Sequence, residues 1–265
     1  MTSRVKVMKG ETGAVANQGA SILSSLGDFI SRNPEAKYSA DDMLKMVGRI
    51  DPEVRNLDNA MEKYQNLLES DIYDWKITDG SVQVNETLRE LSFALESDYI
   101  ESNEFRGRIQ LFPLTAYGSF RIRVVNGKVL ILVFGSFVSI PPVQRALKNI
   151  FRQNGIRLKQ VEWSSDALRR IETADSARTM RAKIARIDGQ LSADLGDPEG
   201  VDRTPTGSNL KSSGEMRVLR FDSRVYAENW IQIQGDIGVI SSSLNESDTI
   251  DYIINRLLPE SDFNL

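Results

Sequence analysis

The sequence predicts an α+β protein with an acidic helical N-terminal part and a basic mixed α/β part after it. Three observations carry this prediction. Apolar residues recur at helical spacing through the first half of the chain, and Asn126-Gly127 separates two strand-like runs. The sign of the charge also changes near Phe105. With 265 residues, of which 40% are hydrophobic, the chain can form one large domain or two small ones.

Composition suggests where these parts begin and end. Residues 1–19 are mostly small and polar and are expected to form a flexible arm. Residues 20–104 are expected to form the acidic helical domain, and residues 105–265 the basic α/β domain. Residues 196–215 are rich in Gly, Pro, Ser and Asp, which is typical of a flexible loop.

Three helices are expected in the acidic part. The first follows Ser21 as N-cap, and the second follows Ser39, with Asp42 as the acidic member of a capping box. The third is expected to start at Asp51-Pro52, because proline suits the first helical position. Its apolar seam steps by three and four residues through Val54, Leu57, Met61, Tyr64 and Leu68.

A hairpin and a fourth helix are expected next. Two short alternating runs between Ile72 and Val84 flank Asp79-Gly80, a good type I′ turn. Asn85 then looks like the cap of a helix with Leu88, Leu91 and Leu95 facing inward. Three helices followed by a hairpin are the order of elements in a winged helix. The alternative is a helical subdomain of no particular type.

The basic part begins with the hairpin from Phe120 to Phe134, in which Arg121 and Arg123 share one face and the second strand is apolar on both faces. A helix is expected from Pro141 to Asn154, a strand at 156–163, and a helix from Ser165 to about residue 181. Residues 182–195 could continue that helix or turn back as a hairpin. Strands at 216–221 and 230–240 and a helix capped by Asn245 complete the expected elements.

The charge asymmetry is the main functional signal. Residues 51–104 hold fourteen acids and four bases, whereas residues 105–161 hold ten bases and no acid. Lysine and arginine bind phosphate and release its counterions, which supplies most sequence-independent affinity for nucleic acid. The expected function is therefore that of a non-catalytic nucleic-acid-binding or regulatory protein. The cations expected to bind the phosphate backbone are Arg121, Arg123, Arg145, Lys148, Arg152, Arg157 and Lys159.

Other uses of these charges remain open. The acidic and basic parts could pair within the chain or between copies, which would make this a structural protein that assembles into a homo-oligomer. The third expected helix carries Glu53, Asp58 and Glu62, and phosphate would repel it. If this acidic part covers the basic face, it would act as an autoinhibitory cover.

Catalysis has little support in the sequence. The chain has no His and no Cys, which excludes Ser-His-Asp triads, cysteine nucleophiles and zinc sites of thiolate or imidazole. Asp74-x-Lys76 resembles the carboxylate pattern of Mg²⁺-dependent nucleases, but so short a pattern is common by chance. We therefore expect no catalytic residue, no metal site and no cofactor, with the nuclease kept as a further alternative.

The expected location is the cytoplasm. The longest strongly apolar run, Val129–Phe134, is much shorter than the roughly 20 residues of a membrane-spanning helix. The basic residues near Met1 have no apolar stretch behind them, so we expect no secretory signal and no membrane partner.

Overall fold

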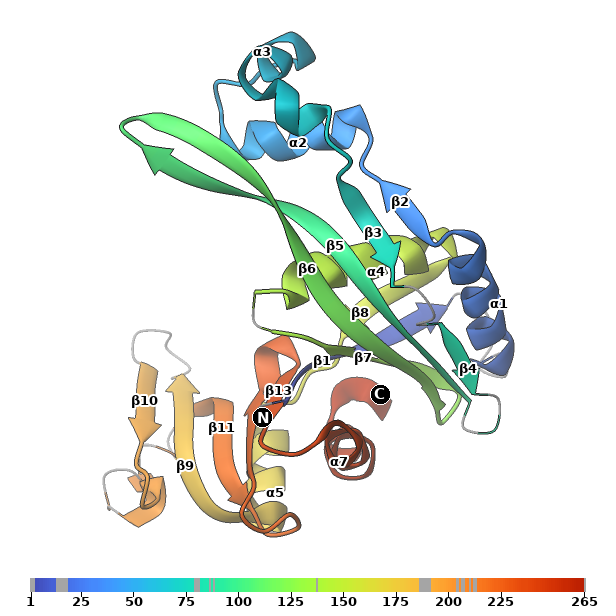
Figure 1. The fold of residues 1–265 in the computed structure, drawn as a ribbon. Coiled ribbons are helices and arrows are strands. Elements are labelled where there is room, and N and C mark those ends of the chain that lie inside the picture. Colours follow the sequence, from blue (N-terminus) through green and yellow to red (C-terminus); the bar gives the residue numbers. More distant parts are fainter. Residues whose placement is uncertain are drawn as a thin grey trace. The chain divides into compact units, whose positions relative to one another are not determined.

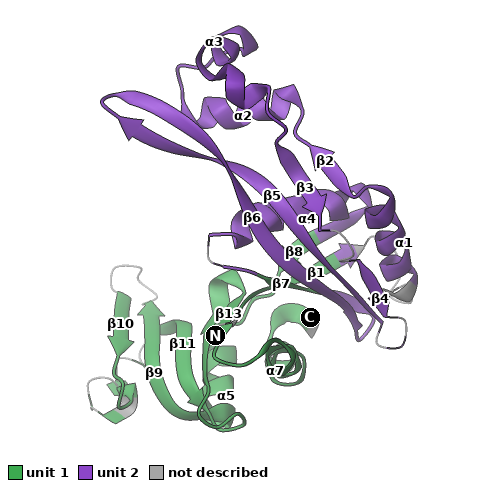
Figure 2. Cartoon of the chain, in the orientation of Figure 1, with its two compact units in different colours: residues 1–10, 130–134, 158–265 green, residues 11–129, 135–157 purple. Residues whose placement is uncertain are grey.

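A computed structural model describes residues 3–12, 19–78, 82–85, 87, 89–136, 138–185, 192–203, 205, 208–209, 211 and 214–264. The chain divides into two compact units, both of them discontinuous in sequence (Figure 2). Unit 1 comprises residues 1–10, 130–134 and 158–265. Unit 2 comprises residues 11–129 and 135–157. Helices and antiparallel strands occur in both, so the protein is α+β, although strands dominate.

In its described residues unit 2 contains four α-helices and strands in the order β6-β5-β3-β2, in which β4 also pairs with β5 (Figure 1). The helices are α1 (Gly19–Arg32), α2 (Ala40–Ile50), α3 (Leu57–Leu68) and α4 (Ile140–Gln153). The strands are β2 (Glu35–Lys37), β3 (Tyr73–Ile77), β4 (Gln83–Asn85), β5 (Glu90–Phe105) and β6 (Arg108–Val125).

The long ribbon of β5 and β6 is the centre of unit 2. The two strands pair antiparallel from Glu90↔Arg123 to Phe105↔Arg108, at the end of the ribbon. Phe93 and Phe120 are opposite each other and stack with ring centroids 4.8 Å apart in the core. Because the ribbon joins residues from both sides of Phe105, the domain boundary expected there is wrong: it falls at the tip of a hairpin inside one unit.

The helix expected after Asn85 is also wrong, since Glu90–Phe105 is strand β5. Leu88 lies outside the described residues. Leu91 and Leu95 fit helical spacing, but together with Phe93 they also alternate with period two, and all three are buried. Cross-strand pairing with β6 along the whole strand favours the extended conformation over the helix.

The hairpin expected between Ile72 and Val84 does not form. β3 pairs with β5 at Glu96 and Leu95, and β4 pairs with β5 from Ser92 to Glu90, so both strands run along the same edge of β5 in the same direction. Asp79-Gly80 lies outside the described residues. β3 and β4 therefore do not form the hairpin that the winged-helix interpretation required as its wing.

One of the three expected helix starts is confirmed, because Ser39 caps α2 by accepting the amide of Asp42 at 3.1 Å. The first helix is present, but α1 already begins at Gly19, so Ser21 lies inside the helix and is not its N-cap. The start expected at Asp51-Pro52 is wrong, because Asp51 ends α2 and α3 is capped by Asn56.

Asp51 instead joins the two helices as a buried carboxylate. It accepts hydrogen bonds from the hydroxyl of Tyr64 at 2.8 Å, from the amide of Glu53 at 3.0 Å and from Lys63 Nζ at 3.4 Å. Burial alone would raise the pKa of Asp51, but these donors outweigh it and lower that pKa. Burial and Asp51 raise the pKa of Tyr64 to about 12, so its hydroxyl remains a donor at neutral pH.

Unit 1 is a second antiparallel arrangement, and the α-helices in its described part are α5 (Ser165–Asp175) and α7 (Glu246–Tyr252). Its strand order is β10-β9-β11-β12-β13-β1-β7, and β8 also pairs with β1. The strands are β1 (Ser3–Thr12), β7 (Lys128–Phe134), β8 (Ile156–Gln160), β9 (Ser176–Ala185), β10 (Ser192–Gly196), β11 (Glu215–Ser223), β12 (Trp230–Gln234) and β13 (Val239–Ser242). Residues 11–12 of β1, 128–129 of β7 and 156–157 of β8 belong to unit 2.

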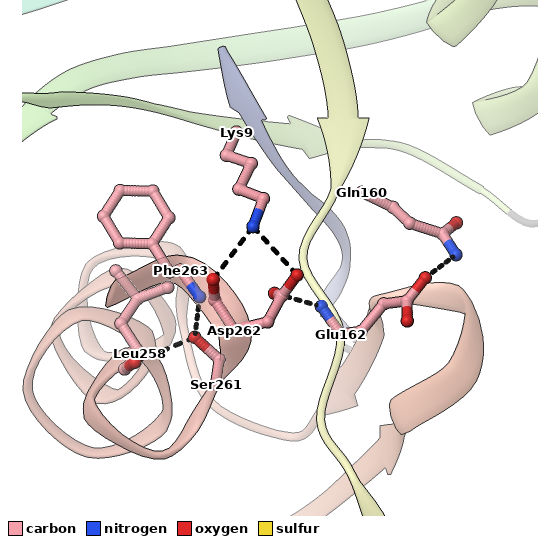
Figure 3. A network of polar contacts seen from close by, with 7 residues as sticks. All are labelled: Lys9, Gln160, Glu162, Leu258, Ser261, Asp262 and Phe263. Carbon is pink, nitrogen blue, oxygen red and sulfur yellow. Dashed lines mark hydrogen bonds and ion pairs between the residues drawn. The ribbon is translucent and has the colours of Figure 1, made fainter. Parts of the chain in front are cut away.

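The flexible arm expected at residues 1–19 is wrong for its first part, because Ser3–Thr12 is strand β1. Val5 and Val7 are fully buried, and β1 pairs with β13. Lys9 Nζ donates to the carbonyl and to the carboxylate of Asp262, both at 2.8 Å (Figure 3). Residues 13–18 lie outside the described residues. The alternation of Val5 and Val7 was the strand signal that the polar composition concealed.

In unit 1 the helix expected from Ser165 to about residue 181 ends at Asp175, where Ser176 begins β9. The alternative left open for residues 182–195 resolves as a strand pair, because β9 and β10 are antiparallel from Ala185↔Ser192 to Arg181↔Gly196. The strand expected at 230–240 is two antiparallel strands, β12 and β13, joined through a 3₁₀ turn and a left-handed Gly238. The flexible loop expected at 196–215 is wrong for part of its length, because Val201–Arg203 is a 3₁₀ helix in which Val201 is buried. Residues 204, 206–207, 210 and 212–213 lie outside the described residues.

The predictions around the second hairpin and the last helix are confirmed. β6 ends at Val125 and β7 begins at Lys128, with Asn126 and Gly127 both at positive φ, as a type I′ turn requires. Residues 129–134 of β7 are all buried, which explains why this strand is apolar on both faces. Asn245 caps α7 by accepting the amide of Asp248 at 2.9 Å.

Candidate nucleic-acid interface

Helix α4 carries three of the seven predicted cations, and its inner face determines where they lie. Val143, Leu147 and Ile150 are fully buried at helical spacing. The backbone of β6 comes so close at Gly118 that a Cβ there would lie 2.5 Å from Cγ1 of Val143. This packing turns the opposite stripe of α4, which holds Lys148 and Arg152, toward solvent.

Arg145 belongs to the same helix but turns toward the sheet. Its Nη2 donates to the backbone carbonyl of Asp98 at 2.9 Å, and its Nε lies 3.9 Å from Oδ1 of Asp74. The guanidinium also lies over the ring of Tyr38, 5.2 Å from the centroid. Burial, followed by the charge of Asp74, raises the pKa of Tyr38. Arg145 is therefore already engaged by a carboxylate, a carbonyl and an aromatic ring.

Arg121 and Arg123 are also matched by an acidic partner. Both lie on β6 on the face opposite Phe120 and Ile122, as their alternation predicts. Glu90 of β5 is directly opposite Arg123 in the ladder and is only 8% exposed. Its carboxylate bonds to Arg123 Nε and lies 3.7 Å from Nη1 of Arg121. One carboxylate thus partly neutralises two of the expected phosphate-binding groups.

The remaining cations are more exposed. Lys148, Arg152 and Arg157 all belong to unit 2, are exposed, and have no carboxylate within salt-bridge distance among the residues that the structure describes. Arg152 has one weak contact, a 3.4 Å hydrogen bond to the amide oxygen of Asn149. Lys159 is exposed on β8 but belongs to unit 1 and has an interaction of its own.

The seven predicted residues therefore do not form one equivalent set. Arg121, Arg123 and Arg145 bind acidic or carbonyl groups of residues 74–98, and Lys148, Arg152 and Arg157 do not. The acidic partners were invisible in the sequence because the acidic and basic stretches were assigned to separate domains. The pairing of β5 with β6 places them side by side, and only the ladder register identifies Glu90 as the partner of Arg123.

The Asp-x-Lys pattern does not form a cluster of carboxylates. Asp74 is buried and its Oδ2 accepts a 2.6 Å hydrogen bond from the amide of Asn149, whereas Lys76 is exposed, 5.4 Å from the ring centroid of Tyr73. Within the described ranges no three acidic side chains are grouped so that they could hold a metal ion.

Comparison with known proteins adds no relative: no protein-family model, curated protein or solved structure matches the chain. Among the described helices, none has the length and apolar character needed to cross a membrane. The structure by itself thus defines the class: a two-unit α+β protein whose second unit presents an exposed cationic stripe on α4.

Proposed function

We propose that this chain is a non-catalytic nucleic-acid-binding protein and that Lys148, Arg152 and Arg157 contact the phosphate backbone. One observation carries the proposal: these three exposed cations lie within ten residues of one another in the sequence, and no carboxylate in the described part of the chain lies within salt-bridge distance of them. The cations that do have acidic partners, Arg121, Arg123 and Arg145, are given a structural role instead.

Electrostatics supports this choice. Lys148 and Arg152 are four residues apart on one helix face, and like charges at that spacing destabilise a helix by a few tenths of a kcal/mol. A bound polyanion would relieve the repulsion and would release condensed counterions, which is the main source of sequence-independent affinity for nucleic acid. Arg152 and Arg157 can each contact a phosphate through two N–H groups.

The test compares two variants with the same change in net charge. The double variant Lys148→Glu, Arg152→Glu should bind a DNA duplex more weakly, and the slope of log K against log salt should fall by about two. The control, Lys45→Glu with Arg55→Glu, reverses two exposed cations elsewhere in unit 2. An equal loss of affinity in both variants, or an unchanged slope in the first, would show that α4 does not bind the phosphates.

A second function, assembly into a homo-oligomer, is favoured by the opposite charge of α3. Asp58, Glu62 and Glu69 are exposed on or directly after this helix. The α3 surface of one copy would then pair with the α4 stripe of another. After nuclease treatment the molar mass measured by light scattering should exceed that of one chain, and Glu62→Lys should lower it. A monomer under these conditions, together with co-purified nucleic acid before treatment, would leave the first function alone.

A further inference from the structure

Strand β5 has an exposed edge that no other strand covers over its distal part. β3 pairs with β5 only at Lys76↔Glu96 and Ile77↔Leu95, but β5 continues to Phe105. Over this stretch β6 occupies one side of β5, and the described residues provide no strand on the other side. An edge of this kind offers N–H and C=O groups to another extended segment.

The register shows which backbone groups point outward. In an antiparallel ladder, residue pairs that exchange two hydrogen bonds alternate with pairs that exchange none. Ile100 is opposite Pro113, which has no N–H, so this pair cannot exchange two hydrogen bonds and is a non-hydrogen-bonded pair. Such pairs alternate along an antiparallel ladder, so Ser102 opposite Leu111 belongs to the same class. The N–H and C=O groups of Ile100 and Ser102 therefore face away from β6, toward the open edge.

Asp98, two residues before Ile100 on β5, shows that this edge accepts hydrogen bonds. Its backbone carbonyl also faces away from β6 and accepts a hydrogen bond from the guanidinium of Arg145 at 2.9 Å. Its carboxylate accepts a hydrogen bond from the backbone amide of Tyr73 at 2.8 Å. Beyond this point the edge is exposed, since residues 101–105 are all exposed. A new strand would thus begin at Ile100.

A cavity of about 360 Å³ lies at the same place. Tyr99 and Ile100 both line it, and because consecutive side chains of a strand point to opposite faces, the cavity must lie along the strand edge. Its other walls are mostly apolar and come from two helices. They are Met46, Arg49 and Ile50 of α2 and Pro141, Pro142 and Arg145 of α4.

We propose that this cavity binds an extended peptide segment that adds as a strand to the edge of β5, with adjacent apolar side chains and an acidic residue beside them. The outward N–H and C=O groups of Ile100 and Ser102 would bond to its backbone. Its alternating side chains would contact Met46 and Ile50 on one face and the two prolines on the other. Arg49 is exposed and has no acidic partner in the described structure, so it would bind the carboxylate. This site is separate from the α4 stripe and does not depend on the function proposed above.

The experiment uses the full chain and the fluorescein-labelled peptide Ser-Thr-Leu-Val-Glu-Thr-Ser, followed by fluorescence anisotropy. Saturable binding with a Kd below about 1 mM is expected. The same peptide with N-methylated amides at Leu and Glu, and in a second form at Val, tests the backbone contacts without changing the protein. At least one methylated form should bind at least about tenfold more weakly, because a methylated amide cannot donate to the strand edge.

Two pairs of protein variants test the two kinds of contact. Ser102→Pro removes an outward N–H at an exposed position and should weaken binding about tenfold, whereas Ser102→Ala keeps the N–H and should not. Arg49→Glu should weaken binding about tenfold, and a peptide with Lys in place of Glu should restore it. Lys45→Glu, on the same helix but outside the cavity, should change Kd less than about twofold.

Three results would overturn the proposal. The first is the absence of saturable binding. The second is equal affinity for the unmodified peptide and both methylated peptides. The third is displacement of the peptide by octanoate combined with unchanged affinity in Ser102→Pro, because the cavity would then bind a small apolar acid without strand addition.

Discussion

Helix α4 is held against the sheet by a contact that leaves no room for a methyl group at Gly118. A Cβ at this position would lie 2.5 Å from Cγ1 of Val143, whereas nonbonded carbon atoms prefer about 3.5–4.0 Å, so the overlap is about 1 Å. Val143 is fully buried and its β-branched side chain has little rotamer freedom. We therefore expect Gly118→Ala to lower the free energy of unfolding by about 1–3 kcal/mol.

A double-mutant cycle separates this clash from other effects of the substitution. Val143→Ala removes two buried methyl groups and should cost about 2 kcal/mol by itself. In the double variant the new Cβ occupies part of the vacated space. The loss of unfolding free energy in the double variant should therefore be smaller than the sum of the losses in the two single variants by at least about 1 kcal/mol. Urea unfolding followed by far-UV circular dichroism measures each corner of the cycle, provided that the m-value is unchanged.

The control for this cycle is Gly196→Ala, because a Cβ at Gly196 would meet no atom within 4 Å. This change should alter the free energy of unfolding by less than about 0.5 kcal/mol. Additive costs for Gly118→Ala and Val143→Ala, within about 0.5 kcal/mol, would refute the reasoning, since they would mean that the two residues do not touch.

Two further predictions concern buried carboxylates. Tyr252→Phe should lower the free energy of unfolding by about 1–3 kcal/mol in chemical denaturation, because the hydroxyl donates to the buried Asp175 at 2.5 Å; Tyr226→Phe, with no such bond, is the control. Asp51→Asn should destabilise the protein by about 1–2 kcal/mol at pH 7, measured by urea unfolding at several pH values. Since hydrogen bonds from Tyr64 and other donors lower the folded-state pKa of Asp51, the stability it adds is present above its unfolded pKa and is lost as the pH falls through the folded value. A difference between wild type and Asp51→Asn that stays constant down to about pH 2 would contradict this assignment.

Features that depend on a few neighbouring residues were readable in the sequence. The Asn126-Gly127 turn, the Ser39 cap and the Asn245 cap all form as predicted, because each is determined by local backbone geometry and by one short-range hydrogen bond. The apolar second strand at Val129–Phe134 was equally clear, since a strand buried on both faces needs no alternation.

In the candidate site, the exposure of the cations on α4 could be predicted from the sequence, but the ion pairs could not, because only the exposure depends on neighbouring residues alone. The exposure of Lys148 and Arg152 follows from the helical period of α4, which is a local property. The engagement of Arg145 by Asp74, and of Arg123 by Glu90, depends on contacts across 71 and 33 positions in sequence, which composition could not reveal.

The sequence by itself determined the α+β class, the Asn126-Gly127 turn, two helix caps and the uneven distribution of charge along the chain. Tertiary structure alone decided that Leu91 and Leu95 lie on a strand, because a spacing of four residues fits one face of a strand as well as one face of a helix until β6 pairs with the segment. It also decided which cations remain available: ion pairs form between groups that the ladder register brings together, and a register is set by packing over the whole sheet.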